Sequence, residues 1–200
     1  MDTTLAPRVR RPAVSGYYYP EEPQVLRQVL GRLLQMPARP PAGRPDAAHA
    51  GAPSQKTAAQ GVIVPHGSLG QSGAVAGAVF GSIRIPRRCV ILGPSHTGSA
   101  LRWSVFARGG YRTPLGVVDI DEALCAALLE GCSFLEVDAW GHQGEHAIEV
   151  VLPFLQYAGP GELRIVPIVS SSNHVEELDE LAQALERAIR AQEEDVLLIA

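Results

Sequence analysis

"CVILGPSHTG", residues 89–98, combines a short apolar run with a histidine directly after the run ends. The run stops at Gly93-Pro94, and His96 follows two residues later. Continuous runs of β-branched and aliphatic residues are typical of strands buried on both faces of a parallel sheet. The same arrangement occurs in "GVIVP" (61–65), which is followed at once by His66.

The rest of the chain alternates between apolar runs and segments with helical spacing. Further strands are expected at 102–107, 163–170 and 195–200. Helices are expected from about Pro23 to Leu34 and near 71–82, 121–130, 145–158 and 175–192. Short apolar strands that are separated by helices predict an α/β fold, with a mainly parallel sheet sandwiched between helices.

A length of 200 residues suits a single well-cored domain, so one α/β domain over residues 1–200 is expected. Residues 37–60 are rich in Pro, Ala and Gly and lack aromatic residues, which predicts a mobile insertion with a solvated His49. The sequence stops at Ala200, inside the last expected strand. We therefore expect this chain to lack a C-terminal part of its fold.

Composition argues against several classes of protein. The net charge is −4 and no run of Lys or Arg creates a basic patch, so a nucleic-acid partner is not expected. No apolar stretch approaches the roughly 20 residues that span a bilayer, and no secretory signal is evident. A cytoplasmic protein without a membrane partner is expected. The sequence also lacks the glycine-rich phosphate loops and the G-x-S-x-G serine elbow.

The cysteines do not suggest a metal or disulfide framework. Cys89, Cys125 and Cys132 are widely spaced, and none belongs to a C-x-x-C pair. Each lies in an expected strand or helix, which predicts core residues rather than nucleophiles.

Two histidines stand where ligands collect in open α/β sheets, beyond the carboxyl ends of the strands. His66 and His96 each follow a proline-containing turn, and glycine lies within two residues of each. Imidazoles on stiff turns lose little freedom on binding and so suit a divalent metal. The alternative is that each ring only hydrogen-bonds a turn backbone.

His146 is the third candidate, at the start of an expected amphipathic helix with Glu145 and Glu149. The positive end of a helix dipole disfavours a charged imidazole there, so a neutral ligand, base or hydrogen-bond donor is expected. The alternative is a capping histidine without chemistry. His142 and His174 are expected to be solvated, the latter in a cap before the last helix.

Five motifs occur in an order that resembles the Memo family, whose microbial members are called AmmeMemoRadiSam system protein B. The resemblance runs from about residue 11 to the end of the chain. The motifs are "PAVSGYYYP" (12–20), "VIVPHGSLGQSG" (62–73), "CVILGPSHTG" (89–98), "YRTPLG" (111–116) and "EHAIEVVLPFLQ" (145–156). The resemblance implies a fold similar to that of the class III extradiol dioxygenases, which use non-haem iron(II).

The resemblance also implies a metal pocket. His66 and His96 match two of its metal ligands, and His146 matches a further pocket histidine. A divalent metal is expected, Fe(II) first, with copper or zinc as alternatives. The remaining family groups, an Asp/His pair and a cysteine, would follow Ala200, and the three cysteines of this chain do not match that cysteine.

Two positions depart from the family pattern: Leu69 stands where tyrosine is usual, and Val151 where histidine is usual. The expected function is a metal-binding protein, either a non-haem iron redox or dioxygenase-like enzyme of unknown small-molecule substrate, with His146 as acid–base partner, or a metal-assisted hydrolase. The alternative is a non-catalytic metal-binding adaptor that works with radical-SAM and AMMECR1-like proteins.

Overall fold

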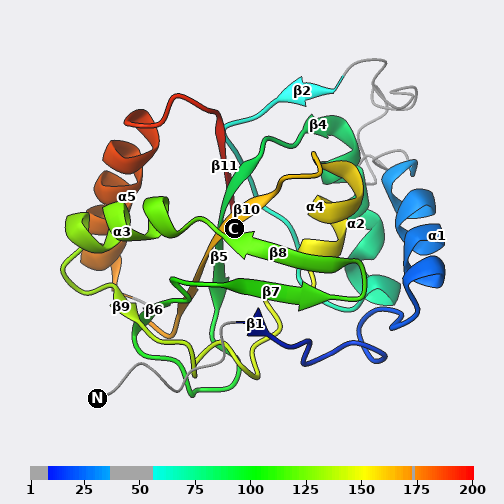
Figure 1. The fold of residues 1–200 in the computed structure, drawn as a ribbon, viewed down its shortest axis with the longest axis horizontal. Coiled ribbons are helices and arrows are strands. Elements are labelled where there is room, and N and C mark those ends of the chain that lie inside the picture. The colour runs from blue at the N-terminus through cyan, green and yellow to red at the C-terminus, as the bar shows by residue number, and fades with distance from the viewer. Residues whose placement is uncertain (1–8, 37–55, 173) are drawn as a thin grey trace, which may run out of the picture.

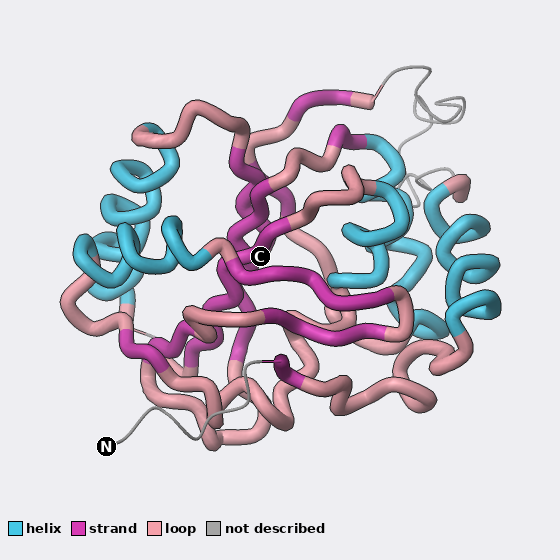
Figure 2. The backbone as a smooth tube through the Cα atoms, in the orientation of Figure 1, coloured by secondary structure: helices cyan, strands magenta, loops and turns pink. Residues whose placement is uncertain are grey.

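The computed structural model describes residues 9–36, 56–172 and 174–200, in which helices cover both faces of a central sheet (Figure 1). Nine strands of these residues form the sheet, whose main order is β1-β7-β8-β10-β5-β11-β3. Figure 2 shows the strands gathered between two groups of helices. The strands are β1 (Val9–Arg10), β3 (Gly61–Val62), β5 (Arg88–Pro94), β6 (Trp103–Val105), β7 (Gly110–Thr113), β8 (Gly116–Ile120), β9 (Glu136–Val137), β10 (Arg164–Ser170) and β11 (Val196–Ile199).

The apolar runs form the centre of the sheet. β5 lies between β10 and β11 and is parallel to both. The opposite edge of β10 is shared, because β8 pairs in parallel with its start and β6 pairs antiparallel with its end. The segments Cys89–Ile91 and Ile165–Val169 are buried, as expected for strands covered on both faces. The predicted α/β fold with a mainly parallel sheet is confirmed.

The helices lie in two layers (Figure 1). One layer holds α3 (Glu122–Gly131) and α5 (Val175–Arg190), and the other holds α1 (Pro23–Leu34), α2 (Leu69–Ser82) and α4 (Leu152–Ala158). Among the described residues, no helix is both long and apolar enough to cross a bilayer.

Glycines let α2 approach α1 closely. Gly73, Gly77 and Gly81 recur every four residues, and so lie on one face of α2. A Cβ on Gly77 would lie 2.5 Å from the carbonyl oxygen of Leu33, and one on Gly81 would lie 2.3 Å from that of Leu34. The backbones of the two helices are therefore in direct contact, and this contact fixes the position of α2, which follows the loop that carries His66.

Several local predictions need correction. The helix expected at 145–158 is shorter, because residues 147–151 form turns and α4 begins at Leu152, with Pro153 in its first turn. Of the insertion expected at 37–60, residues 37–55 (and with them His49) lie outside the described residues. Residues 57–58 are not loop but form the short strand β2 (Thr57–Ala58), paired with β4 (Ile83–Arg84). The antiparallel hairpin of β7 and β8 was not expected.

His142 is buried, so the prediction of a solvated loop histidine is wrong. Its Nδ1 accepts a hydrogen bond from the hydroxyl of Tyr111 at 2.6 Å, and its Nε2 lies 3.3 Å from the carbonyl oxygen of Ser104. These partners place the ring proton on Nε2. Burial lowers the pKa of His142 to about 4, because a charged ring would lose its hydration.

We expect Gly77→Ala to lower the free energy of unfolding by about 1–3 kcal/mol, because the new methyl would meet backbone atoms of α1. Gly70→Ala is the matched control in the same helix, since a Cβ there meets nothing within 4 Å. The control is expected to be neutral or stabilising by up to about 1 kcal/mol. Urea denaturation of the two variants checks this, and equal effects would contradict the close helix contact.

A second prediction concerns pH. The pKa of His142 is lower in the folded protein than its usual 6.5, so the folded state binds fewer protons than the unfolded chain. Above pH 6.5 this contribution to the free energy of unfolding is complete. It decreases as the pH falls from 6.5 to about 4, and its full size is roughly 1.4 kcal/mol for each unit by which the pKa is shifted. His142→Asn should therefore flatten the dependence of stability on pH between these values, which urea denaturation across this pH range checks.

Candidate metal centre

The sheet brings together the two histidines that follow strands. His66 lies in the loop between β3 and α2, and His96 follows the last residue of β5 by two positions. Their strands are not neighbours, because β11 pairs with both β3 and β5 and lies between them. Even so, the Nε2 atoms of the two rings are 3.4 Å apart. The shared carboxyl edge of the parallel strands thus places the two imidazoles tip to tip.

His146 completes what we term the histidine cluster, consisting of His66, His96 and His146. Its ring centroid lies 4.3 Å from that of His96 and 6.0 Å from that of His66. The side chain is 16% exposed, and the ring of Tyr18 packs edge-on against it at 4.9 Å. His146 lies just before the turns that precede α4 and does not cap this helix, whose N-cap is Val151.

The carboxylate of Glu145 holds two members of the cluster in place. It is 1% exposed, and it accepts a hydrogen bond from the ring Nδ1 of His96 at 2.8 Å. It also accepts from the backbone N–H groups of His96, His146 and Ala147, at 2.5, 2.7 and 2.9 Å. The sequence placed Glu145 near a helix start but gave no sign of its contact with His96, which is 49 residues away.

These bonds decide the protonation of Glu145 and the tautomer of His96. Burial alone would raise the pKa of the Glu145 carboxyl, but the hydrogen bonds from His96, His146 and Ala147 outweigh it and lower the pKa to about 2. An ionised Glu145 keeps the proton of His96 on Nδ1. Nε2 is therefore the ring nitrogen of His96 that is left to bind a cation, and it faces His66.

The surroundings of His66 and His146 favour the neutral form of each ring. The pKa of His66 is lowered, chiefly by burial and then by the nearby His96 and His146. Burial also lowers the pKa of His146, although Glu145 opposes the shift. Neutral imidazoles are the form that binds metals, so these two rings are suited to a cation at neutral pH.

The donor set fits a first-row divalent metal. Two imidazole nitrogens that are each about 2.1 Å from one tetrahedral ion would lie about 3.4 Å apart. This is the separation of the Nε2 atoms of His66 and His96. Ligand atoms of His96, Glu145 and His146 also lie within 4.8 Å of one another. Oε1 of Glu145 accepts hydrogen bonds from His96, His146 and Ala147, and so orients His96, whereas Oε2 accepts only one, from the backbone of His96, and keeps a lone pair for an ion.

The remaining candidates lie elsewhere. His174 is exposed at the N-cap of α5, as predicted. All three cysteines are buried core residues, also as predicted, and burial raises the pKa of each thiol. They contribute nothing to the histidine cluster.

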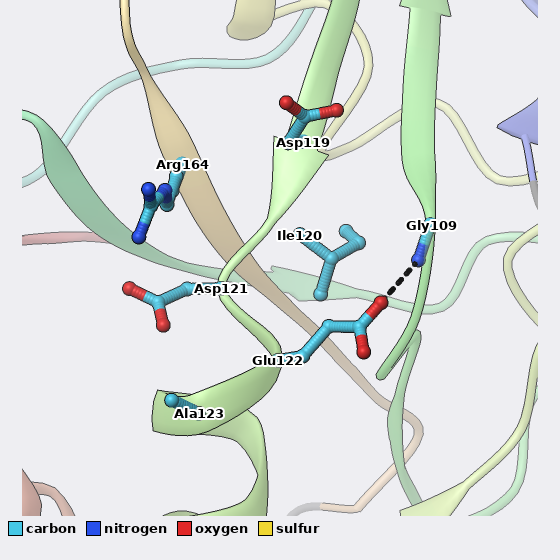
Figure 3. Close-up of a pocket in the computed structure, with 7 residues that line it drawn as sticks. All are labelled: Gly109, Asp119, Ile120, Asp121, Glu122, Ala123 and Arg164. Carbon is cyan, nitrogen blue, oxygen red and sulfur yellow. Dashed lines mark hydrogen bonds between the residues drawn. The ribbon is translucent and has the colours of Figure 1, made fainter.

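A separate pocket of about 390 Å³ lies near the start of β10, at the opposite end of that strand from the histidine cluster (Figure 3). Two of its three acidic residues have structural partners. Asp121 caps α3 and pairs with Arg88, and Glu122 accepts a hydrogen bond from the backbone of Gly109. The pocket is lined by Gly109, Asp119, Ile120, Asp121, Glu122, Ala123 and Arg164. No sequence motif points to it.

Comparison with known proteins identifies the family of the chain. Residues 10–200 match the family model described as Memo-like protein. The chain is 33% identical to a MEMO1 family protein of Aquifex aeolicus over 96% of its own length and 65% of the relative's. It is 34% identical to one of Methanopyrus kandleri (88% and 61%) and 36% identical to one of Aeropyrum pernix (81% and 57%). The chain thus spans about two thirds or less of the length of these three relatives. It belongs to the Memo family.

Proposed function

We propose that the histidine cluster binds a divalent first-row metal, with Fe(II) as the expected ion. His66 and His96 would hold it through their Nε2 atoms, and His146 would stand beside it. The observation that carries the proposal is the 3.4 Å separation of these two Nε2 atoms. Imidazole ligands suit iron, copper and zinc, so the donor set favours transition metals over calcium or magnesium.

Each residue of the centre has a distinct task in this proposal. Glu145 fixes the ring of His96, as carboxylates do behind metal-binding histidines. His146 has a lowered pKa, so it is neutral at pH 7 and can accept a proton from a substrate. A bound Fe(II) would supply redox chemistry and open coordination positions for a small-molecule substrate and dioxygen.

Anaerobic calorimetric titration with Fe(II) tests the metal site. We expect binding with a Kd on the order of 1 μM in this chain, and its loss in His66→Ala/His96→Ala, because the double change removes both Nε2 donors. His174→Ala is the matched control, since this exposed histidine lies at the N-cap of α5, outside the cluster. Absence of binding in the parent chain, or full binding in the double variant, would contradict the proposal.

Glu145→Gln tests the carboxylate separately from the ligands. The change keeps the shape of the side chain but removes the charge that holds the Nδ1 proton of His96. We expect metal affinity to fall about 10–100-fold without abolishing binding.

A second candidate function is a non-catalytic metal-binding adaptor that works with radical-SAM and AMMECR1-like proteins. Two buried apolar side chains favour it: Leu69 is 7% exposed and Val151 is 3% exposed, where the family resemblance implies tyrosine and histidine. Loss of two polar groups from the pocket would leave fewer groups to handle a substrate.

Oxygen uptake with catechol as a probe separates the two candidates. An oxidative enzyme should consume oxygen in a metal-dependent manner, and His146→Gln should reduce the rate at least tenfold while Fe(II) still binds. An adaptor should bind Fe(II) with no catechol-dependent uptake. A metal-assisted hydrolase, the third class considered, would show no dependence on oxygen.

A further inference from the structure

Arg10 is a fully buried arginine whose guanidinium fastens one loop at three points. Its Nε donates to the carbonyl oxygen of His142 at 2.9 Å. Its Nη1 pairs with the carboxylate of Glu149, and its Nη2 donates to the carbonyl oxygen of Glu145. All three acceptors belong to residues 142–149, the stretch that also carries His146. A planar guanidinium suits such a contact, because its donors point in fixed directions.

Glu149 also binds residues 13–19, which we term the N-terminal segment. Its two oxygens accept hydrogen bonds from the backbone N–H groups of Ala13 at 2.8 Å and Val14 at 3.0 Å. The hydroxyl of Tyr19 donates to it at 2.5 Å. The side chains of Arg10 and Glu149 are both 0% exposed, so this ion pair is shielded from solvent and salt.

The N-terminal segment in turn touches the loops of two cluster members. The ring of Tyr18 packs edge-on against His146, and the carbonyl oxygen of Tyr18 accepts from the backbone N–H of Leu69 at 2.8 Å. Leu69 begins α2, three residues after His66. The buried ion pair is therefore connected to all three rings. Glu145 links it to His146, its chain neighbour, and through its carboxylate to His96. Tyr18 links it to the loop of His66.

We propose that Arg10 and Glu149 are positioning residues that align the three rings of the histidine cluster without contacting a ligand. Neither side chain reaches the solvent side of the cluster, and each acts through a neighbour: Arg10 through Glu145, and Glu149 through the segment that ends in Tyr18 and Tyr19. The consequence for metal binding rests on the function proposed above, whereas the alignment of the rings does not depend on any metal.

A role in stability alone would not account for this pair. Burying two charges incurs a desolvation penalty that their attraction barely offsets, and apolar replacements of buried pairs are often neutral or stabilising. The directed contacts to His142 and Glu145 instead provide a fixed loop geometry, which matters where ligands must be held within about 0.5 Å.

The first test needs no metal. Nitrogen-15 NMR of the imidazole rings in the metal-free chain should show His96 as the Nδ1–H tautomer, held by Glu145. Arg10→Lys keeps the charge opposite Glu149 but cannot make three directed contacts, so the His96 signals should shift toward a mixture of tautomers. Arg10→Met/Glu149→Gln removes both charges together, and it guards against the case in which the single variant does not fold.

The matched control is Leu128→Ala, which opens the core in α3, in the other helix layer, without touching the histidine cluster. It should lower the unfolding temperature and leave the His96 tautomer unchanged. A His96 signal that responds to Leu128→Ala as strongly as to Arg10→Lys would overturn the proposal. So would a His96 signal that stays unchanged in both Arg10 variants.

Fe(II) titration then separates this inference from the proposed function. Arg10→Lys should weaken Fe(II) binding at least tenfold, and Leu128→Ala should leave it within twofold of the parent. If the parent chain binds no Fe(II), but Arg10→Lys changes the His96 tautomer, the metal site is refuted and the alignment is supported. A parent chain that binds Fe(II), with Arg10→Lys binding equally well and no tautomer change, refutes the alignment and supports the metal site.

Discussion

The carboxylate of Glu145 is the constraint on which the candidate centre depends. One buried group accepts hydrogen bonds from a ring nitrogen and three backbone N–H groups, and these donors come from two loops that are far apart in sequence. An acceptor with this many donors stays ionised, and an ionised acceptor fixes the proton of His96 on the side away from His66. The chemistry open to the histidine cluster follows from that single protonation state.

The fold supplies the geometry that Glu145 then refines. Parallel strands end at one edge of the sheet, so loops that follow β3 and β5 meet there although β11 separates the strands. The close contact of α1 with Gly77 and Gly81 fixes the position of α2, whose first residue, Leu69, follows His66 by three positions. The positions of the three rings thus depend on the strand order, on the contact between two helices and on one buried carboxylate.

The sequence was a good guide to what is local and a poor guide to what is distant. Runs such as 89–93 and 163–170 revealed the central strands because burial on both faces leaves a continuous apolar signal. The sequence did not predict the hairpin of β7 and β8, because the exposed Arg112 and Asp119 interrupt the apolar pattern. The burial of His142 depends on Tyr111 and Ser104, which are 31 and 38 residues away, and the partner of Arg10 is 139 residues away. No periodicity encodes such pairs.

The buried thiols bear on how the chain would withstand oxidants. Cys89 is the second residue of β5 and His96 follows the end of that strand, so the thiol and the candidate centre are separated by about 20 Å of chain. Burial keeps the thiols protonated at neutral pH, and it is the thiolate that peroxide attacks. Cys89, Cys125 and Cys132 are therefore poorly placed to react with an oxidant that reaches the sheet edge carrying the histidine cluster.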